Sequence, residues 1–356
     1  MEFDIILRKR IKMNTNRPII IAGAGPAGLS AAINLAKSGQ EVIIYEKNPD
    51  VGLRYHGQIQ GLENWLYDID TIEWLDKLNL NIDLHCKSLY TMSLFSPDLK
   101  KFDLSGKTPI VYLLQRGNED GCLDFTLKNY AETLGVKIKF NARIIPSNAD
   151  IIATGRPKAT YMASGINFKT NIDDIFWMII DNELAPKGYG YFFSFNGNAT
   201  IGSVINTDFI NLFRYFEKTL ASFRKLTSFK TDREKHFTGS GYFNINYNFN
   251  KLIVGEAAGF QDYLYGAGIK FAMHSGYLAA KSLNDITKYK ELVKKEIYPV
   301  QKIVVVDRFF WEIFGNKSKK ILFLLQKITH DKKIFKTIAR FLYPLISIKY
   351  LLARKF

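Results

Sequence analysis

The sequence predicts an α/β fold, and three observations lead to that prediction. A strand, a glycine-rich turn, a helix and a second strand follow one another over residues 19–46. Alternating apolar and polar positions, typical of antiparallel strands, recur between residues 86–114 and 158–249. Helical spacing of apolar residues then dominates residues 291–356. A chain of 356 residues that is 47% hydrophobic and 23% charged is long enough to bury a large core.

The first of these segments has the pattern of a nucleotide-binding turn. The apolar strand Ile19–Ala22 runs into Gly23-x-Gly25-x-x-Gly28, and the helix Leu29–Lys37 follows. The first glycine of this pattern forms the turn, the second lets the backbone approach a pyrophosphate, and the third lets the helix pack on the strand. The N-terminus of the helix then offers N–H groups and a positive dipole end to the phosphates.

The second strand of this segment supports the same reading. Glu41–Tyr45 ends at Glu46, which lies 18 residues after Gly28. This is close to the roughly 20 residues expected for the carboxylate that binds ribose hydroxyls. The sequence therefore predicts a Rossmann-like dinucleotide-binding domain. The residues expected to contact the dinucleotide here are Gly23, Gly25, Pro26, Ala27, Gly28, Glu46 and Lys47.

Later segments resemble those of FAD-dependent oxidoreductases of the hydroxylase-like superfamily. Residues 149–155, ADIIATG, resemble the strand-ATG element of these proteins, and residues 252–259, LIVGEAAG, resemble the strand-GD motif. In the second motif Glu256 replaces the family's Asp. Gly266-Ala-Gly-Ile269 opens a helix over Lys270–Leu283, and Gln115-Arg116 precedes a helix over Cys122–Leu134. The resemblance implies one FAD, held in addition by Arg54, Arg116, Thr154, Gly155, Gly255, Glu256, Gly266, Gly268 and Ile269.

The electron donor of such a flavin is left open by the sequence. No second G-x-G-x-x-G follows a strand, so a permanently bound pyridine nucleotide is not expected. An external donor is expected instead, either NADPH that binds transiently or a ferredoxin-like protein.

The strand Tyr189–Phe195, YGYFFSF, has five aromatic rings in seven positions. With a period of two, Tyr189, Tyr191, Phe193 and Phe195 share one face of the strand. A hydrophobic core is one explanation of this wall of rings, and the wall of a cavity for an apolar ligand is the other.

Residues 185–195, APKGYGYFFSF, resemble the Pro-x-x-Tyr-x-Trp-x-Phe-Pro signature of geranylgeranyl reductases. Pro186, Tyr189 and Phe193 match, whereas Tyr191 replaces the Trp and Ser194 the second Pro. The Cys-Gly pair that the family often has after the second strand is missing, so a role of that cysteine cannot be transferred. The resemblance implies a reductase that saturates carbon–carbon double bonds of isoprenoid chains, with Tyr189, Phe193 and Phe195 against the substrate.

Saturation of an unactivated alkene needs a hydride and a proton. The candidate proton donors are Tyr191, His56 and Tyr265, and ordered water is an alternative. The main alternative function is an FAD-dependent monooxygenase or hydroxylase of a hydrophobic substrate. The Trp-x-Trp-x-Ile pattern of flavin-dependent halogenases does not occur. A prenyl cyclase without net redox change and a flavin-binding protein without turnover are further alternatives.

The C-terminal region is basic and amphipathic. Residues 317–356 contain eleven Lys or Arg and one acid, Asp331, while the whole chain has a net charge of +15. Apolar residues at 321, 324, 325 and 328, and again at 335, 338, 339 and 342, have helical spacing. Such a segment is typical of a helix at a membrane interface rather than of a nucleic-acid-binding tail. The alternative is a helical subdomain that packs on the body of the protein.

Other classes of protein are disfavoured. Two cysteines fit a reducing cytoplasm, and five scattered histidines give no metal-ligand spacing, so no metal is expected. Neither an apolar run long enough to span a membrane nor a signal-peptide core is evident. We therefore expect a cytoplasmic, peripheral membrane protein. The expected domains are an FAD-binding domain (17–85, 115–157 and 250–290), a substrate-binding sheet domain (86–114 and 158–249) and the helical C-terminal region (291–356).

Overall fold

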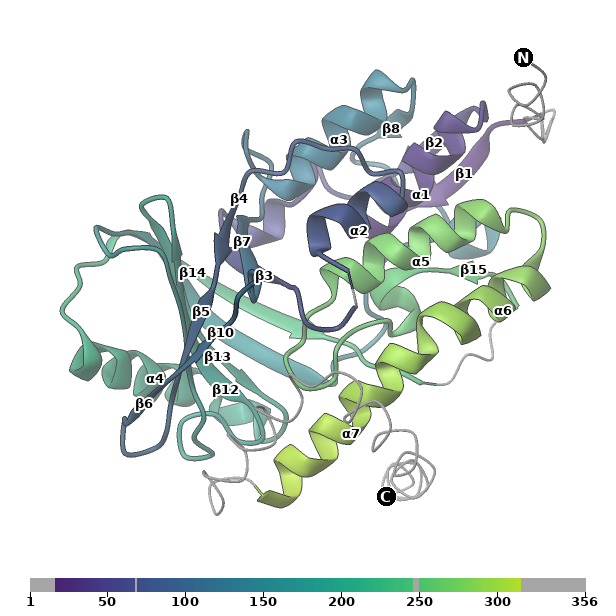
Figure 1. Cartoon of the computed structure of the whole chain (residues 1–356). Coiled ribbons are helices and arrows are strands. Elements are labelled where there is room, and N and C mark those ends of the chain that lie inside the picture. Colours follow the sequence, from purple (N-terminus) through teal and green to yellow (C-terminus); the bar gives the residue numbers. More distant parts are fainter. Residues whose placement is uncertain (1–16, 68, 246–249, 315–356) are drawn as a thin grey trace.

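The structure, a computed structural model, describes residues 17–67, 69–245 and 250–314. Its nucleotide-binding half is a five-stranded parallel sheet in the order β15-β9-β1-β2-β8. The helix α1 packs against both α3 and α5 beside this sheet (Figure 1). The elements are β1 (Ile19–Ala22), β2 (Val42–Tyr45), β8 (Lys137–Lys139), β9 (Ile151–Ile152), β15 (Leu252–Ile253), α1 (Pro26–Lys37), α3 (Leu123–Thr133) and α5 (Ile269–Lys281).

A second, seven-stranded sheet has the order β14-β10-β13-β12-β11-β5-β6. Its pairs are antiparallel except β5 with β11, which is parallel. One face packs on the helix α4, and Phe192 of β12 and Phe216 and Phe223 of α4 are fully buried between them. The elements are β5 (Thr91–Phe95), β6 (Lys101–Ser105), β10 (Tyr161–Lys169), β11 (Ile175–Ile179), β12 (Tyr189–Phe195), β13 (Asn198–Ile205), β14 (Asp232–Gly241) and α4 (Leu212–Leu226).

A third sheet of three antiparallel strands corrects one expectation. Residues 86–114 were expected to belong, together with residues 158–249, to one substrate-binding sheet. Instead β4 (Cys86–Leu89) and β5 lie in different sheets, separated at the half-exposed Tyr90. β7 (Val111–Gln115) is the central strand of the third sheet, between β4 and β3 (Ile59–Glu63). A central strand is buried on both faces, which hides the alternation that marks a strand of a half-exposed sheet.

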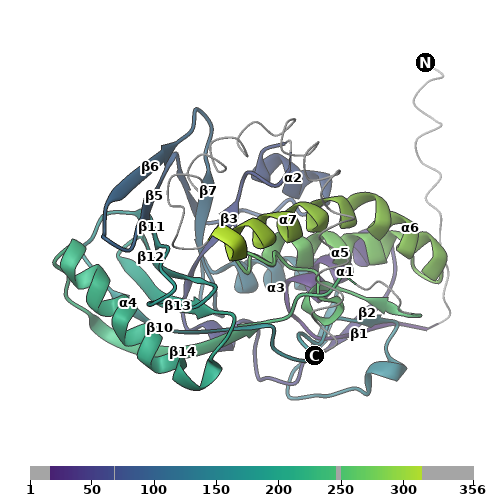
Figure 2. The ribbon, with the colours of Figure 1, turned by 90° about the horizontal axis from the view of Figure 1, so that it is seen from below.

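Two helices, α6 (Ile286–Glu296) and α7 (Tyr298–Phe314), follow α5 (Figure 2). The expected helical C-terminal region is confirmed up to Phe314. The basic amphipathic segment lies outside the described residues. Within the part of the chain that the structure describes, no helix is long and apolar enough to cross a membrane. The remaining elements are α2 (Thr71–Lys77) and the short 3-10 helices η2 (Leu53–Tyr55), η3 (Pro146–Asn148), η4 (Phe209–Asn211) and η5 (Gly255–Ala258).

Candidate functional site

A cavity of about 480 Å³ lies where the glycine-rich turn, β3, the seven-stranded sheet and the start of α5 meet. Gly25, Pro26 and Ala27 line one end of it, and the rings of β12 line another part. Volumes of this size are typical of small-molecule sites. The predicted site residues that line the cavity are Gly25, Pro26, Ala27, Arg54, Arg116, Gly155, Tyr189, Tyr191, Phe193, Glu256, Tyr265, Gly266, Gly268 and Ile269.

The glycine turn is shaped to receive a ligand backbone. A Cβ added at Gly28 would lie 2.0 Å from the carbonyl oxygen of Gly23, so this glycine allows the helix to pack on the turn. A Cβ at Gly25 or Gly155 would meet no atom within 4 Å. Gly25 is the N-cap of α1 and leaves the first turn of the helix without a side-chain cap. Open space beside uncapped N–H groups is the feature that a pyrophosphate requires, so these residues fit the dinucleotide FAD.

The buried carboxylate of Glu46 fixes the turn from the end of β2. One oxygen, Oε2, accepts from the Ala24 amide at 2.9 Å. The other, Oε1, accepts from the backbone and side-chain nitrogens of Asn48 at 3.0 and 2.8 Å. A carboxylate has room for about four hydrogen bonds, so capacity for a ribose hydroxyl remains. The exposed Lys47 does not line the cavity.

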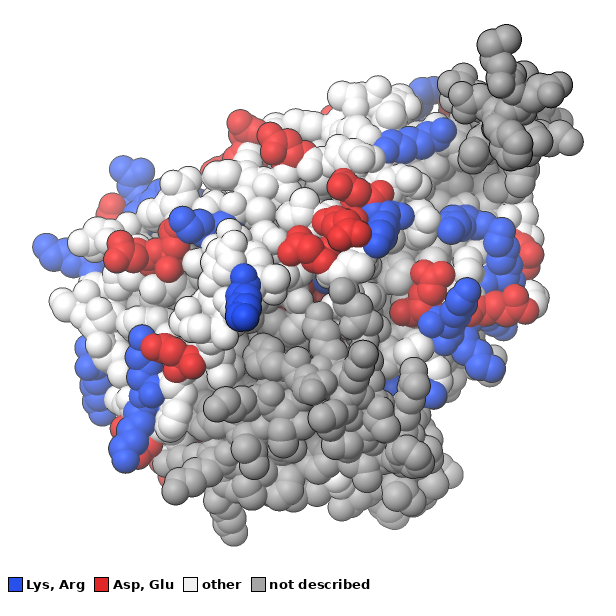
Figure 3. All heavy atoms as spheres, in the orientation of Figure 1, with Lys and Arg blue, Asp and Glu red and all other residues white. Residues whose placement is uncertain are grey.

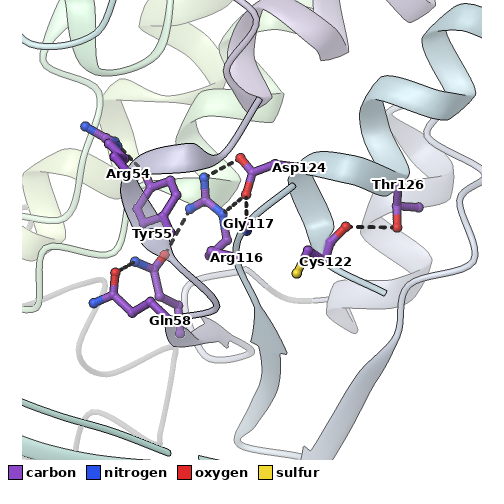
Figure 4. Close-up of polar contacts among 9 residues, drawn as sticks. Arg54, Tyr55, Gln58, Arg116, Gly117, Cys122, Asp124 and Thr126 are labelled. Atoms are coloured by element: carbon purple, nitrogen blue, oxygen red, sulfur yellow. Dashed lines mark hydrogen bonds and ion pairs between the residues drawn. The ribbon is translucent and has the colours of Figure 1, made fainter. Parts of the chain in front are cut away.

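Arg116 is held in a buried cluster (Figure 4). Its Nε and Nη2 donate to both oxygens of Asp124 at 2.7 and 2.8 Å, and its Nη1 donates to Gln60 at 2.9 Å. Its guanidinium carbon lies 4.0 Å from the ring centroid of Tyr55, and that of Arg54 lies 4.6 Å from the same centroid. Burial alone would lower the pKa of Arg116, but Asp124 and Tyr55 reverse this effect and hold the pKa above its ordinary value. The cation is therefore permanent at this wall.

Glu256 lies at the same wall, on η5. Its carboxylate is 3.8 Å from a guanidinium nitrogen of Arg54. Burial raises the pKa of Glu256, and Arg54 opposes this rise. Thr154 and Gly255 do not line the cavity. Gly255 instead packs against α1, where an added Cβ would lie 2.8 Å from that of Ala27.

The aromatic strand has the predicted faces. Tyr189, Tyr191 and Phe193 line the cavity, whereas Phe192 on the opposite face packs on α4. The ring of Phe193 stacks on that of Phe176 with 4.1 Å between centroids. Phe195, expected at the substrate, does not line the cavity and packs against His85 instead, with centroids 5.2 Å apart. It lies at the end of the strand, beyond the reach of the site.

The three proton-donor candidates have different positions. Tyr191 lines the cavity and accepts from the Gln58 side chain at 3.2 Å. Tyr265 lines the cavity and packs edge-on against Trp65 and Trp311. His56 is exposed, has a left-handed φ of 49° after η2, and does not line the cavity. His56 is thus not brought together with the other two.

Two cavity tyrosines have hydroxyls that are already engaged. Tyr189 donates to the carbonyl oxygen of Tyr265, and Tyr161 donates to that of Gly266 at 3.3 Å. Burial raises the pKa of Tyr189, Tyr161 and Tyr191 well above that of free tyrosine. These three phenols are therefore weak acids that shape the wall.

Sequence reasoning missed several lining residues, among them a buried acid. Glu63, at the end of β3, is only 2% exposed, and its Oε1 has no hydrogen-bond partner among the described residues. Burial raises its pKa to about 7, and Lys270 opposes the rise. The residues of β3, IQGLE, do not alternate between apolar and polar in the way that marks a strand, so no local signal reveals it. Other missed lining residues are Tyr55, Gln60, Trp65, Arg156, Tyr161, Phe176, Met178 and Phe237.

No group of three or more His, Cys, Asp or Glu side chains that could hold a metal ion occurs among the residues that the structure describes.

Comparisons with known proteins agree with this geometry. Residues 21–68 match the family model described as an NAD(P)-binding Rossmann-like domain. An uncharacterised protein of Methanosarcina barkeri is 26% identical over 308 residues, which are 76% of this chain and 75% of that protein.

Two solved structures are similar in fold. A geranylgeranyl bacteriochlorophyll reductase-like protein from Thermoplasma acidophilum has a TM-score of 0.67 at 18% identity, over 85% of this chain and 89% of that one. The flavin-dependent brominase Bmp2 has a TM-score of 0.64 at 14% identity, over 95% of this chain and 99% of that one. The chain therefore has the α/β fold of FAD-dependent oxidoreductases such as the hydroxylases.

Proposed function

We propose that this chain, which has the fold of FAD-dependent oxidoreductases, is a reductase that saturates carbon–carbon double bonds of isoprenoid lipid chains. One observation carries the proposal. A wall of aromatic rings from β12 and the uncapped glycine turn line the same cavity, so an apolar chain and a dinucleotide cofactor could meet there.

The cofactor end of the cavity is formed by Gly25, Gly155, Glu256 and the start of α5. The first two leave room for the backbone of the dinucleotide, and Glu256 offers an acceptor for its hydroxyl-bearing chain. The N–H groups at the start of α5 favour negative charge at this place. When bound, a reduced flavin supplies a hydride, and the residues of the chain position the alkene and exclude water.

The substrate end is suited to a ligand without polar groups. Tyr189 and Tyr191 have their hydroxyls engaged within the protein, so their rings present apolar surface. Stacked neighbours such as Phe176 and Phe193 extend this surface. At about 25 cal/mol for each Å² buried, a few isoprene units would bind without a hydrogen bond.

A membrane surface is the proposed place of action, because an isoprenoid lipid is found there. Among the described residues, the support is a group of exposed apolar side chains at η4 and the start of α4. Ile210 is 97% exposed, Phe213 61% and Phe209 37%. On the face that Figure 3 shows, positive and negative side chains are interspersed over the described residues.

A second candidate function is a flavin-dependent monooxygenase or hydroxylase of a hydrophobic substrate. The similarity in fold to the brominase favours it, because that similarity covers nearly the whole of both chains. The absence of the Trp-x-Trp-x-Ile pattern from the sequence weighs against the halogenase form of this alternative.

The test is anaerobic reduction of a prenyl lipid. The protein is reconstituted with FAD, reduced with dithionite, and mixed with geranylgeranyl diphosphate or an unsaturated geranylgeranyl diether lipid. We expect reoxidation of the flavin and a lipid that is heavier by two hydrogens for each bond reduced. NADPH and a reduced ferredoxin are then compared as donors. An unchanged lipid, together with NADPH oxidation in air that an aromatic compound stimulates, would instead support the monooxygenase.

A further inference from the structure

We infer that the carboxyl group of Glu63 is the acid that gives the substrate its proton. The inference rests on the proposed reductase function and assigns a residue that no motif of the sequence marks. In the step, a hydride from the reduced flavin bonds to one alkene carbon and a proton from Glu63 bonds to the other. The double bond is thereby replaced by two C–H bonds, and the carboxylate regains a proton from water after the product leaves.

Glu63 is buried at the wall of the cavity. It ends β3, lines the cavity and lies two residues before Trp65, which packs against Tyr265. Its side chain is almost completely buried, and its Oε1 has no hydrogen-bond partner among the described residues. A buried carboxylate oxygen without a partner is costly, and protonation of the carboxyl group removes most of that cost.

Of the described residues that line the cavity, Glu63 and Glu256 are the carboxylic acids, and none is a histidine, cysteine or lysine. Glu256 lies beside Arg54 at the cofactor end. The hydroxyl protons of Tyr189 and Tyr161 are donated to backbone carbonyls. Tyr191 and Tyr265 also line the cavity, and burial raises the pKa of Tyr191 well above that of free tyrosine. Of the two carboxylic acids, Glu63 is therefore the one that does not lie beside Arg54 at the cofactor end.

The groups around Glu63 shift the pKa of its carboxyl group. Burial raises its pKa to about 7, Lys270 on α5 lowers it, and Asp262 on the loop before α5 raises it. The Lys270 ammonium donates to the backbone carbonyl of Glu63 at 3.1 Å and to Thr71 at 3.0 Å. Tyr67 is a further nearby titratable group, and burial, then Glu63 and Glu296, raise its pKa. A general acid works best when its pKa lies near the working pH.

The experiment compares the wild type with Glu63→Gln and Glu63→Asp. The control is Glu73→Gln, which removes an exposed carboxylate of α2 that pairs with Lys77. One measurement is the titration of the protonated-carboxyl band in infrared difference spectra of the oxidised protein. The other is the rate of single-turnover lipid reduction as a function of pH, with FAD content and lipid affinity measured for each variant.

We expect the wild type to have a carboxyl band that titrates near pH 7 and is missing from Glu63→Gln. Its reduction rate should fall as the pH rises through that midpoint. Glu63→Gln should reduce lipid about 100- to 10,000-fold more slowly, without this pH dependence, while its FAD content and lipid affinity stay unchanged. Glu63→Asp should recover part of the rate, and Glu73→Gln should match the wild type.

Two failures can be told apart. If the wild type reduces lipid and Glu63→Gln does so within threefold and with the same pH profile, the role of Glu63 is overturned and the reductase function stands. A wild type that leaves every lipid unreduced overturns the proposed function, and with it this role, whatever the titration shows.

Discussion

The ring of Tyr191 on β12 fills the space over Gly202, its partner on β13. The two residues face each other in the antiparallel ladder, and a Cβ at Gly202 would lie 2.6 Å from ring atoms. Similar cross-strand pairs are Phe237 with Gly165 and Tyr161 with Gly241. Phe176 of β11 covers Gly61 of β3, which belongs to the three-stranded sheet. Aromatic rings that cover glycines of neighbouring strands are a known device for stabilising sheets. Here all four of these rings line the cavity.

Substitution of Gly202, which lies under the Tyr191 ring, should therefore change the shape of the cavity by displacing that ring. In Gly202→Val the new side chain would push the Tyr191 ring into the cavity. We expect affinity for a geranylgeranyl lipid to fall at least about tenfold, since a loss of about 1.4 kcal/mol is enough, with FAD content unchanged. Fluorescence titration with the lipid measures this. Gly239→Ala is the matched control, because its Cβ would meet its nearest neighbour at 3.9 Å in the same cavity. Equal affinity of the two variants would contradict the prediction.

The two glycines of the turn should respond differently to substitution. Gly25→Val places a side chain in open space, in an extended conformation that valine adopts readily, so the apoprotein should keep its stability but lose FAD. Gly28→Ala would force a Cβ to 2.0 Å from the Gly23 carbonyl oxygen, so it should cost about 1–3 kcal/mol or more of folding free energy. Thermal unfolding and flavin absorbance measure the two effects. Full flavin content in Gly25→Val would show that the dinucleotide does not lie there.

The buried ion pair of Arg116 should be important for stability. Asp124→Asn would leave the guanidinium uncompensated, and this should cost roughly 3–5 kcal/mol, measured by denaturant unfolding. The control is Glu41→Gln, which breaks an exposed pair with Lys137 and should cost less than about 1 kcal/mol. A similar cost for both substitutions would mean that Asp124 does not hold Arg116 in solution.

The pH dependence of stability should report Glu63 without any substrate. Its pKa in the folded protein, about 7, is above the ordinary 4.5, so the folded state binds the proton more tightly. The contribution of Glu63 to the free energy of unfolding is complete below about pH 4.5, and it is lost as the pH rises through about 7. Glu63→Gln does not lose this contribution. Between pH 5 and pH 8 its free energy of unfolding should therefore rise by up to about 3 kcal/mol relative to that of the wild type. Asp262, whose pKa is about 6, changes the stability with pH in the same direction in the wild type and in Glu63→Gln. A constant difference in stability across that range would rule out the raised pKa.

Local patterns were enough to predict the nucleotide-binding half. The strand Ile19–Ala22 has the predicted bounds, and the helices over 26–37, 123–133 and 269–281 were expected within a few residues. In the seven-stranded sheet, the strand Tyr189–Phe195 also has its predicted bounds. In each case the glycine spacing or the apolar period of the segment itself determines the structure.

What the sequence did not predict depends on contacts between distant segments. β3 was missed because its polar residue Glu63 is buried by other parts of the chain. The division of residues 86–95 between two sheets depends on which strands they pair with, and no local signal encodes that. Arg116 was expected at the flavin, but its buried ion pair with Asp124 was not expected. Neither the partners of Tyr191 nor the exposure of His56 could be read from their neighbours in sequence.

The hydroxyls of Tyr189 and Tyr161, on the seven-stranded sheet, donate hydrogen bonds to the backbone carbonyls of Tyr265 and Gly266. These two residues lead directly into α5, whose start lies at the expected cofactor end. Sliding of the sheet relative to the nucleotide-binding half would break both bonds at once. These two hydrogen bonds therefore resist sliding of the seven-stranded sheet against the loop that leads into α5.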